Sequence, residues 1–77
     1  IHHWVVAGSY STKSNAESAA ETITTKYQDI DCKIITLGKM YAVAIYGSSD
    51  RDDCVQYMRK YHKNFGEAWI FTPKEYR

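Results

Sequence analysis

The chain has 77 residues, of which 44% are hydrophobic and 25% are charged, and its formal net charge is +1. This length predicts one domain with a single core. The near-neutral mixture of acids and bases lacks a concentrated basic surface, so we expect no nucleic-acid partner. The longest apolar runs, such as residues 41–46, are far too short to span a membrane, so we expect no membrane contact within this segment.

The first predicted strand covers residues 4–7, a short run of aromatic and β-branched side chains. Residues 8–13 have the composition of a turn. Ser14 and Glu17 have the spacing of a capping box, in which both side chains bond orphan backbone amides, and they predict the start of a helix. The apolar side chains of this helix have helical spacing: Ala16, Ala19, Ala20, Ile23 and Tyr27.

A polar break at residues 28–31 separates this helix from the next two strands. These strands are predicted at residues 32–37 and 40–46, which are rich in β-branched and aromatic side chains. Gly38 and Lys39 lie between them and predict a two-residue hairpin turn.

A second helix is predicted to start at residues 49–52, where Ser49 and Asp52 have spacing like that of a capping box and acidic side chains occupy the first turn, which the helix dipole favours. Gly66 is expected to end this helix. Residues 68–71 form the last predicted strand. The apolar stripe of the second helix consists of Cys54, Met58, Tyr61 and Phe65.

The two halves of the chain repeat one pattern at a constant offset, with Val5 matching Val43 and Ala16 matching Cys54. The predicted element order is βαββαβ. Two such halves form an α+β fold, in which a four-stranded antiparallel sheet carries both helices on one face. The other face of the sheet is then uncovered.

The uncovered face is where we look for function. If Val5 and Ala7 face the helices, alternation along the strand turns Trp4 and Val6 the other way. An exposed apolar patch of this kind usually marks a binding site, although a shift of one residue would reverse the assignment. The other residues expected on this face are Gly8, Met40, Ala42, Ala44, Tyr46, Trp69 and Phe71.

Three stretches of the chain carry a family resemblance. Residues 5–10 (Val-Val-Ala-Gly-Ser-Tyr) form a strand followed by a Gly-Ser-aromatic corner. Residues 41–45 (Tyr-Ala-Val-Ala-Ile) form a third strand, and residues 67–70 (Glu-Ala-Trp-Ile) begin the closing strand. In their order and spacing these stretches resemble the SPOR domain, a glycan-binding repeat of bacterial envelope proteins.

The resemblance implies the ferredoxin-like βαββαβ fold of SPOR domains and a binding module without catalysis or cofactor. Its partner would be septal peptidoglycan, on glycan strands stripped of their stem peptides, which links the module to cell division. Residues 1–77 would be a single SPOR-like domain from the C-terminal part of a longer membrane-anchored envelope protein. The domain would then lie on the periplasmic side.

The resemblance also implies a glycan site on the uncovered sheet face. Sugar rings stack on aromatic side chains, so Trp4, Tyr46 and Trp69 are the candidate stacking residues. Ser9 occupies the corner-serine position of the family and is a candidate polar contact. Val6 and Ala42 are site positions where the family often carries Gln and Arg, so the polar half of its site is poorly preserved here.

Two other functions fit the same element order. A protein-interaction domain could use the uncovered face, through Trp69 and Phe71. An RNA-binding RRM is suggested by residues 39–46, which partly match the motif of its third strand. That function would require Tyr41 and Val43 on the uncovered face, which is the opposite of the SPOR assignment.

We expect no catalytic or metal site. Asp50, Asp52 and Asp53 look like paired carboxylates, but the first turn of a helix explains them better. Cys32 and Cys54 lack the spacing of metal ligands, and we expect buried apolar side chains in preference to a disulfide.

Overall fold

The sheet has four strands in the order β2-β3-β1-β4, and every neighbouring pair is antiparallel. The structure is a computed structural model that describes residues 1–76. The strands are β1 (His3–Tyr10), β2 (Lys33–Leu37), β3 (Met40–Ser48) and β4 (Trp69–Phe71). The helices are α1 (Lys13–Lys26), α2 (Arg51–Lys60) and the short 3-10 helix η1 (Lys74–Tyr76).

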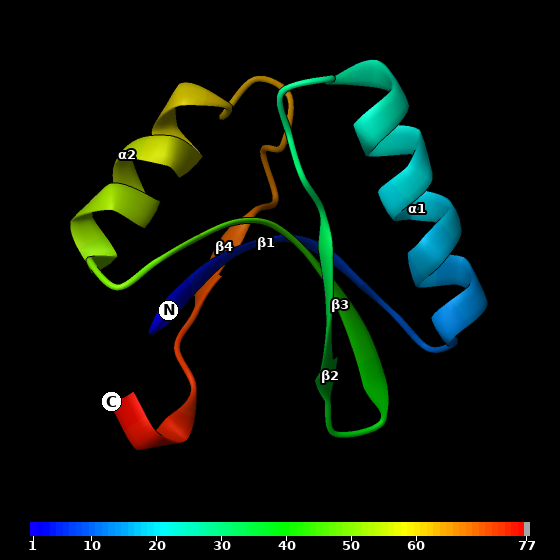
Figure 1. The fold of residues 1–77 in the computed structure, drawn as a ribbon, viewed down its shortest axis with the longest axis horizontal. Coiled ribbons are helices and arrows are strands. Elements are labelled where there is room, and N and C mark those ends of the chain that lie inside the picture. The colour runs from blue at the N-terminus through cyan, green and yellow to red at the C-terminus, as the bar shows by residue number, and fades with distance from the viewer. Residues whose placement is uncertain (77) are drawn as a thin grey trace.

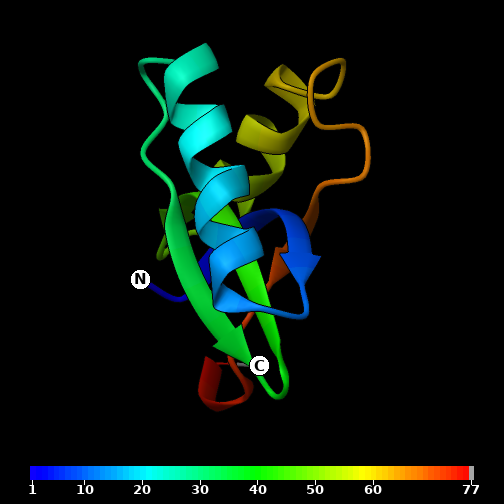
Figure 2. The same ribbon diagram turned by 90° about the vertical axis from the view of Figure 1, so that its right-hand side faces the viewer.

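Helices α1 and α2 cover the same face of the sheet (Figure 1). In the second view α2 lies above the strands and the lower part of α1 overlaps them, while η1 lies at the bottom of the picture, away from both helices (Figure 2). The predicted α+β fold is therefore confirmed. We call the face of the sheet that is turned away from α1 and α2 the helix-free face.

Both helices begin with a side-chain cap. The Asn15 N–H donates to Thr12 Oγ1 at 3.2 Å, so α1 begins before the capping box predicted at Ser14. Threonine and serine are both good N-cap residues. The capping-box spacing therefore predicted Ser14 as the cap, whereas the cap is Thr12. Helix α2 begins within the predicted residues 49–52, but its cap is Asp50 and not Ser49, because the Asp52 N–H donates to Asp50 Oδ1 at 2.9 Å.

Some element ends differ from the prediction. Strand β1 continues to Tyr10 through the residues that have turn composition, because they pair with β3. Helix α2 ends at Lys60 and not at Gly66. A turn follows α2, in which the Phe65 N–H donates to the Tyr61 carbonyl at 2.8 Å. The predicted hairpin turn is confirmed, with Gly38 at a φ of 61°, where glycine has no steric penalty.

Pairing between β1 and β3 is interrupted by two bulges. Val5 faces Tyr46, the next pair is Val6 and Ala44, and Gly8 then faces Val43. Ile45 on β3 and Ala7 on β1 are therefore extra residues without a partner opposite. Each bulge shifts the alternation of side chains along its own strand, and this decides which residues reach the helix-free face.

The hydrophobic core lies between the sheet and the two helices. Its fully enclosed members are Val5, Ile30, Ile45 and Cys54, none more than 3% exposed. Both predicted helical stripes pack against them, through residues that include Ile23, Tyr27, Met58, Tyr61 and Phe65. Cys32 and Cys54 are both free thiols.

Candidate functional site

The helix-free face brings together five of the six residues predicted to form the site. Val6 lies between Ala44 of β3 and Trp69 of β4, directly opposite each of them. Trp4 lies opposite Phe71 at the end of the same strand pair. The bulge at Ala7 brings Ser9 to this face, where Ser9 lies beside Ala42 of β3.

Tyr46 is the sixth predicted residue, and its expected position on the helix-free face is wrong. It lies opposite the core residue Val5, and its ring stacks on Tyr57 of α2 with centroids 4.2 Å apart and planes 6° apart. The cause is the bulge at Ile45, which turns two successive side chains of β3 toward the helices. Gly8 was also expected on the helix-free face, but it lies opposite Val43 on the helix side.

The middle of the helix-free face has a floor of small side chains. Val6 and Ala42 have no exposed surface, and Ala44 is 1% exposed. Larger residues stand on both sides of this row, as Ile35 does beside Ala42 and Trp69 beside Val6. Val6 and Ala42 therefore support the face and do not project from it.

Among the strand residues of this face, two large apolar side chains remain exposed. Trp69 is 42% exposed and lies on the edge strand β4. Its ring meets the ring of Phe71 edge to face, with centroids 6.1 Å apart. Met40 is 39% exposed and lies at the other end of the face, next to the hairpin turn.

The ring of Trp4 packs directly over Gly47. A Cβ atom at position 47 would be 2.6 Å from Trp4 Cε3, which is closer than real Cβ contacts come. Strand β3 lies between β1, which carries Trp4, and β2, which carries Lys33. The Nζ atom of Lys33 is 5.0 Å from the centroid of the Trp4 ring. Sequence reasoning missed both Lys33 and Gly47, although alternation along β2 puts Lys33 on the same face as Ile35.

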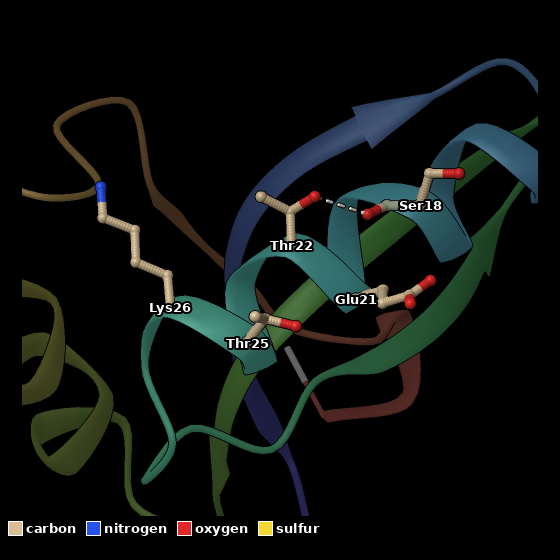
Figure 3. Close-up of a pocket in the computed structure, with 5 residues that line it drawn as sticks. All are labelled: Ser18, Glu21, Thr22, Thr25 and Lys26. Carbon is tan, nitrogen blue, oxygen red and sulfur yellow. Dashed lines mark hydrogen bonds between the residues drawn. The ribbon is translucent and has the colours of Figure 1, made fainter.

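The remaining candidate sites of the described chain carry little chemistry. A hollow on α1 is bordered by side chains of that helix alone, and its Thr22 hydroxyl already donates to the Ser18 carbonyl at 3.0 Å (Figure 3). Within residues 1–76 there is no group of three or more His, Cys, Asp or Glu that could hold a metal ion. In the same residues, no helix is long and apolar enough to cross a membrane.

The acidic residues at the start of α2 have structural partners. Asp50 caps the helix, and the Ser48 hydroxyl donates to Asp53 Oδ2 at 3.0 Å. The group whose pKa rises most lies on the helix side, where burial raises the pKa of Tyr57 to about 12. Neither feature faces the helix-free surface.

An RNA-binding RRM would need Val43 on the helix-free face, and the structure places it on the other face. Val43 lies opposite Gly8 and Ile34 and has no exposed surface. Its neighbours Ala42 and Ala44 occupy the helix-free face, so Val43 points toward the helices. A base could not stack on it.

The comparisons with known proteins agree with this geometry. The family model of the SPOR domain matches residues 1–72, a range that includes all four strands and both α-helices. The comparisons with curated proteins and with solved structures gave no match. SPOR domains are non-catalytic modules that bind peptidoglycan in the bacterial cell envelope. Because the family model covers nearly the whole chain, this protein belongs to the SPOR domain family.

Proposed function

We propose that this domain binds peptidoglycan glycan strands stripped of their stem peptides, along the helix-free face of its sheet. The observation that carries the proposal is the exposed ring of Trp69 beside a floor of small apolar side chains. A pyranose ring presents flat C–H surfaces, and an indole that is exposed on one face offers a matching platform. A bare glycan strand can lie against this exposed ring, whereas stem peptides would hold the strand away from it.

The polar contacts of the proposed site lie at its edge. Ser9 is exposed and carries a hydroxyl that can both donate to and accept from a sugar hydroxyl. Val6 and Ala42 take the positions of the family's Gln and Arg and are buried. Binding would therefore depend on stacking and on edge contacts more than on hydrogen bonds from the floor. The domain would act on the periplasmic side, at septal peptidoglycan.

Co-sedimentation with purified sacculi tests the proposal. Retention of the domain should rise when the sacculi are first treated with an amidase that removes the stem peptides. Trp69→Ala should lose most of this retention while its circular dichroism spectrum stays that of the wild type. Met40→Ala is the matched control, because Met40 is similarly exposed at the far end of the same face.

Two results would count against the proposal. If the wild type is not retained on stripped sacculi, the helix-free face serves another partner, such as a protein. If Trp69→Ala and Met40→Ala reduce retention equally, adhesion is a general property of exposed apolar surface and not stacking at one ring.

A further inference from the structure

We propose that Lys33 binds the free lactyl carboxylate of N-acetylmuramic acid and so gives the domain its preference for stripped strands. This inference rests on the proposed function. In intact peptidoglycan the lactyl carboxyl group is an amide, bonded to the first amino acid of the stem peptide. Hydrolysis by an amidase adds water across that bond, releases the peptide amine and leaves a carboxylate on the sugar. A stripped strand is therefore an anion that carries one such charge on every muramic acid.

Lys33 lies on the face that the glycan would cover. It is exposed and stands opposite Ala44, which in turn stands opposite Val6. Val6 then faces Trp69 on the outer strand, so Lys33 and Trp69 are the two ends of one row across the sheet. Neighbouring strands are about 4.8 Å apart, which places the two ends about 14 Å apart. A short glycan segment lying across the strands can reach both.

The charge of Lys33 has no competitor among the strand residues of this face. Its ammonium group is the one formal charge on them, and none of them carries a carboxylate. An anion that lies across this face would therefore meet one cation and no repelling carboxylate from these strand residues. The strand residues of this face are Trp4, Val6, Ser9, Lys33, Ile35, Leu37, Met40, Ala42, Ala44, Gly47, Trp69 and Phe71.

Trp4 holds the ammonium group over the face. Its ring lies on Gly47, and Lys33 Nζ is 5.0 Å from the ring centroid, which is within the range of a cation–π contact. A lysine side chain that is already placed loses less rotamer entropy when it binds a ligand. The contact with the ring uses one side of the ammonium group and leaves N–H donors on the other side for a carboxylate. In this arrangement Trp4 is a positioning residue.

The chain provides a matched control. Lys60 of α2 also places its Nζ over an aromatic ring, 5.3 Å from the centroid of Tyr61, but it lies on the helix side of the molecule. Lys60→Met therefore removes the same charge and the same kind of contact as Lys33→Met, away from the proposed site. Lys33→Arg keeps the positive charge on the helix-free face.

The test is isothermal titration calorimetry with two glycan probes. The first is a set of amidase-stripped strand fragments, and the second is the same fragments with their carboxylates converted to neutral methylamides by carbodiimide coupling. The wild type should bind the first probe about fivefold more tightly, the size expected of one exposed ion pair. Lys33→Met should bind both probes equally, whereas Lys60→Met and Lys33→Arg should keep the preference.

The outcomes separate this inference from the proposed function. If the wild type binds both probes equally and loses both on Trp69→Ala, the glycan function stands and the role of Lys33 is wrong. If Lys33→Met still binds the carboxylate probe about fivefold more tightly than the methylamide probe, the role of Lys33 is also wrong. If the wild type binds neither probe, the proposed function fails and the role of Lys33 fails with it.

Discussion

The ring of Trp4 occupies the space that a side chain at position 47 would need. A Cβ atom on Gly47 would lie 2.6 Å from both Cε3 and Cζ3 of Trp4, and 2.9 Å from a methyl carbon of Ile1. Glycine is thus required here for close approach and not for backbone conformation, because Gly38 is the only described glycine with a positive φ. The same packing sets the position of the Trp4 ring under Lys33.

We expect Gly47→Ala to displace Trp4 and to lower the free energy of unfolding by about 1–3 kcal/mol, the usual cost of overpacking. Urea denaturation followed by tryptophan fluorescence would measure both effects. Gly66→Ala is the control, because a Cβ there would meet the nearest atom, the His62 carbonyl oxygen, at an ordinary 3.4 Å. Equal stability losses in the two variants would show that Trp4 can move aside freely.

Tyr46 should matter for stability and not for glycan binding. Its ring stacks on Tyr57 and packs against the core, so Tyr46→Ala should lower the free energy of unfolding by about 3 kcal/mol. Tyr46→Phe keeps the ring and should bind stripped glycan as the wild type does. A loss of binding by Tyr46→Phe at unchanged stability would mean that its hydroxyl contacts the ligand after all.

The stability of the fold should decrease in strongly basic solution because of Tyr57. Burial raises the pKa of its hydroxyl from 10 to about 12. The folded protein therefore holds this proton more tightly than the unfolded chain, whose tyrosines titrate near 10. The resulting stabilisation is fully present below pH 10 and is lost as the pH rises to about 12.

Tyr57→Phe isolates this contribution from the other groups that titrate in base. Between pH 10 and about 12, the wild type should lose about 1 kcal/mol more than Tyr57→Phe, after allowance for the solvent that screens a half-buried ring. Urea unfolding at a series of pH values gives, for each protein, the slope of the unfolding free energy against pH. Parallel slopes would show that the hydroxyl has the same pKa in the folded and unfolded chains.

The element order, the covered face and the exposed Trp69 all follow from the sequence. Apolar periodicity identifies the helices and strands, and the antiparallel arrangement then leaves one face bare. The position of Tyr46 could not be predicted, because strict alternation fails wherever a strand carries an extra residue. Ile45 and Ala7 are ordinary strand residues, and nothing in their side chains signals a bulge.

Lys33 was missed for a different reason. A lysine at the start of a strand is usually interpreted as a solvent-exposed residue that makes no specific contact. Its contact with the Trp4 ring reaches from β2 to β1 across the intervening strand β3. The Trp4 ring can extend over β3 because β3 has Gly47, which carries no side chain, beneath the ring. Sequence reasoning considers contacts between neighbouring strands only, so it does not predict a contact between β2 and β1, which are not neighbours.

The two cysteines should differ in their reactivity toward thiol reagents. Cys54 has no exposed surface, and its Sγ lies 3.5 Å from the His3 carbonyl oxygen as a weak hydrogen-bond donor. Cys32 is only partly buried. Burial raises the pKa of both thiols, so both should react slowly at pH 7, but only Cys32 is open to the reagent in the folded state.

Iodoacetamide labelling followed by mass spectrometry of peptides would measure this difference. Cys32 should be modified first, and Cys54 should react only at the rate at which the domain unfolds, so that urea accelerates it strongly. The Cys32→Ser variant serves as the control and should be almost inert in the native state. Rapid labelling of Cys54 in that variant would show that α2 detaches from the sheet without global unfolding, because the Cys54 side chain is enclosed between them.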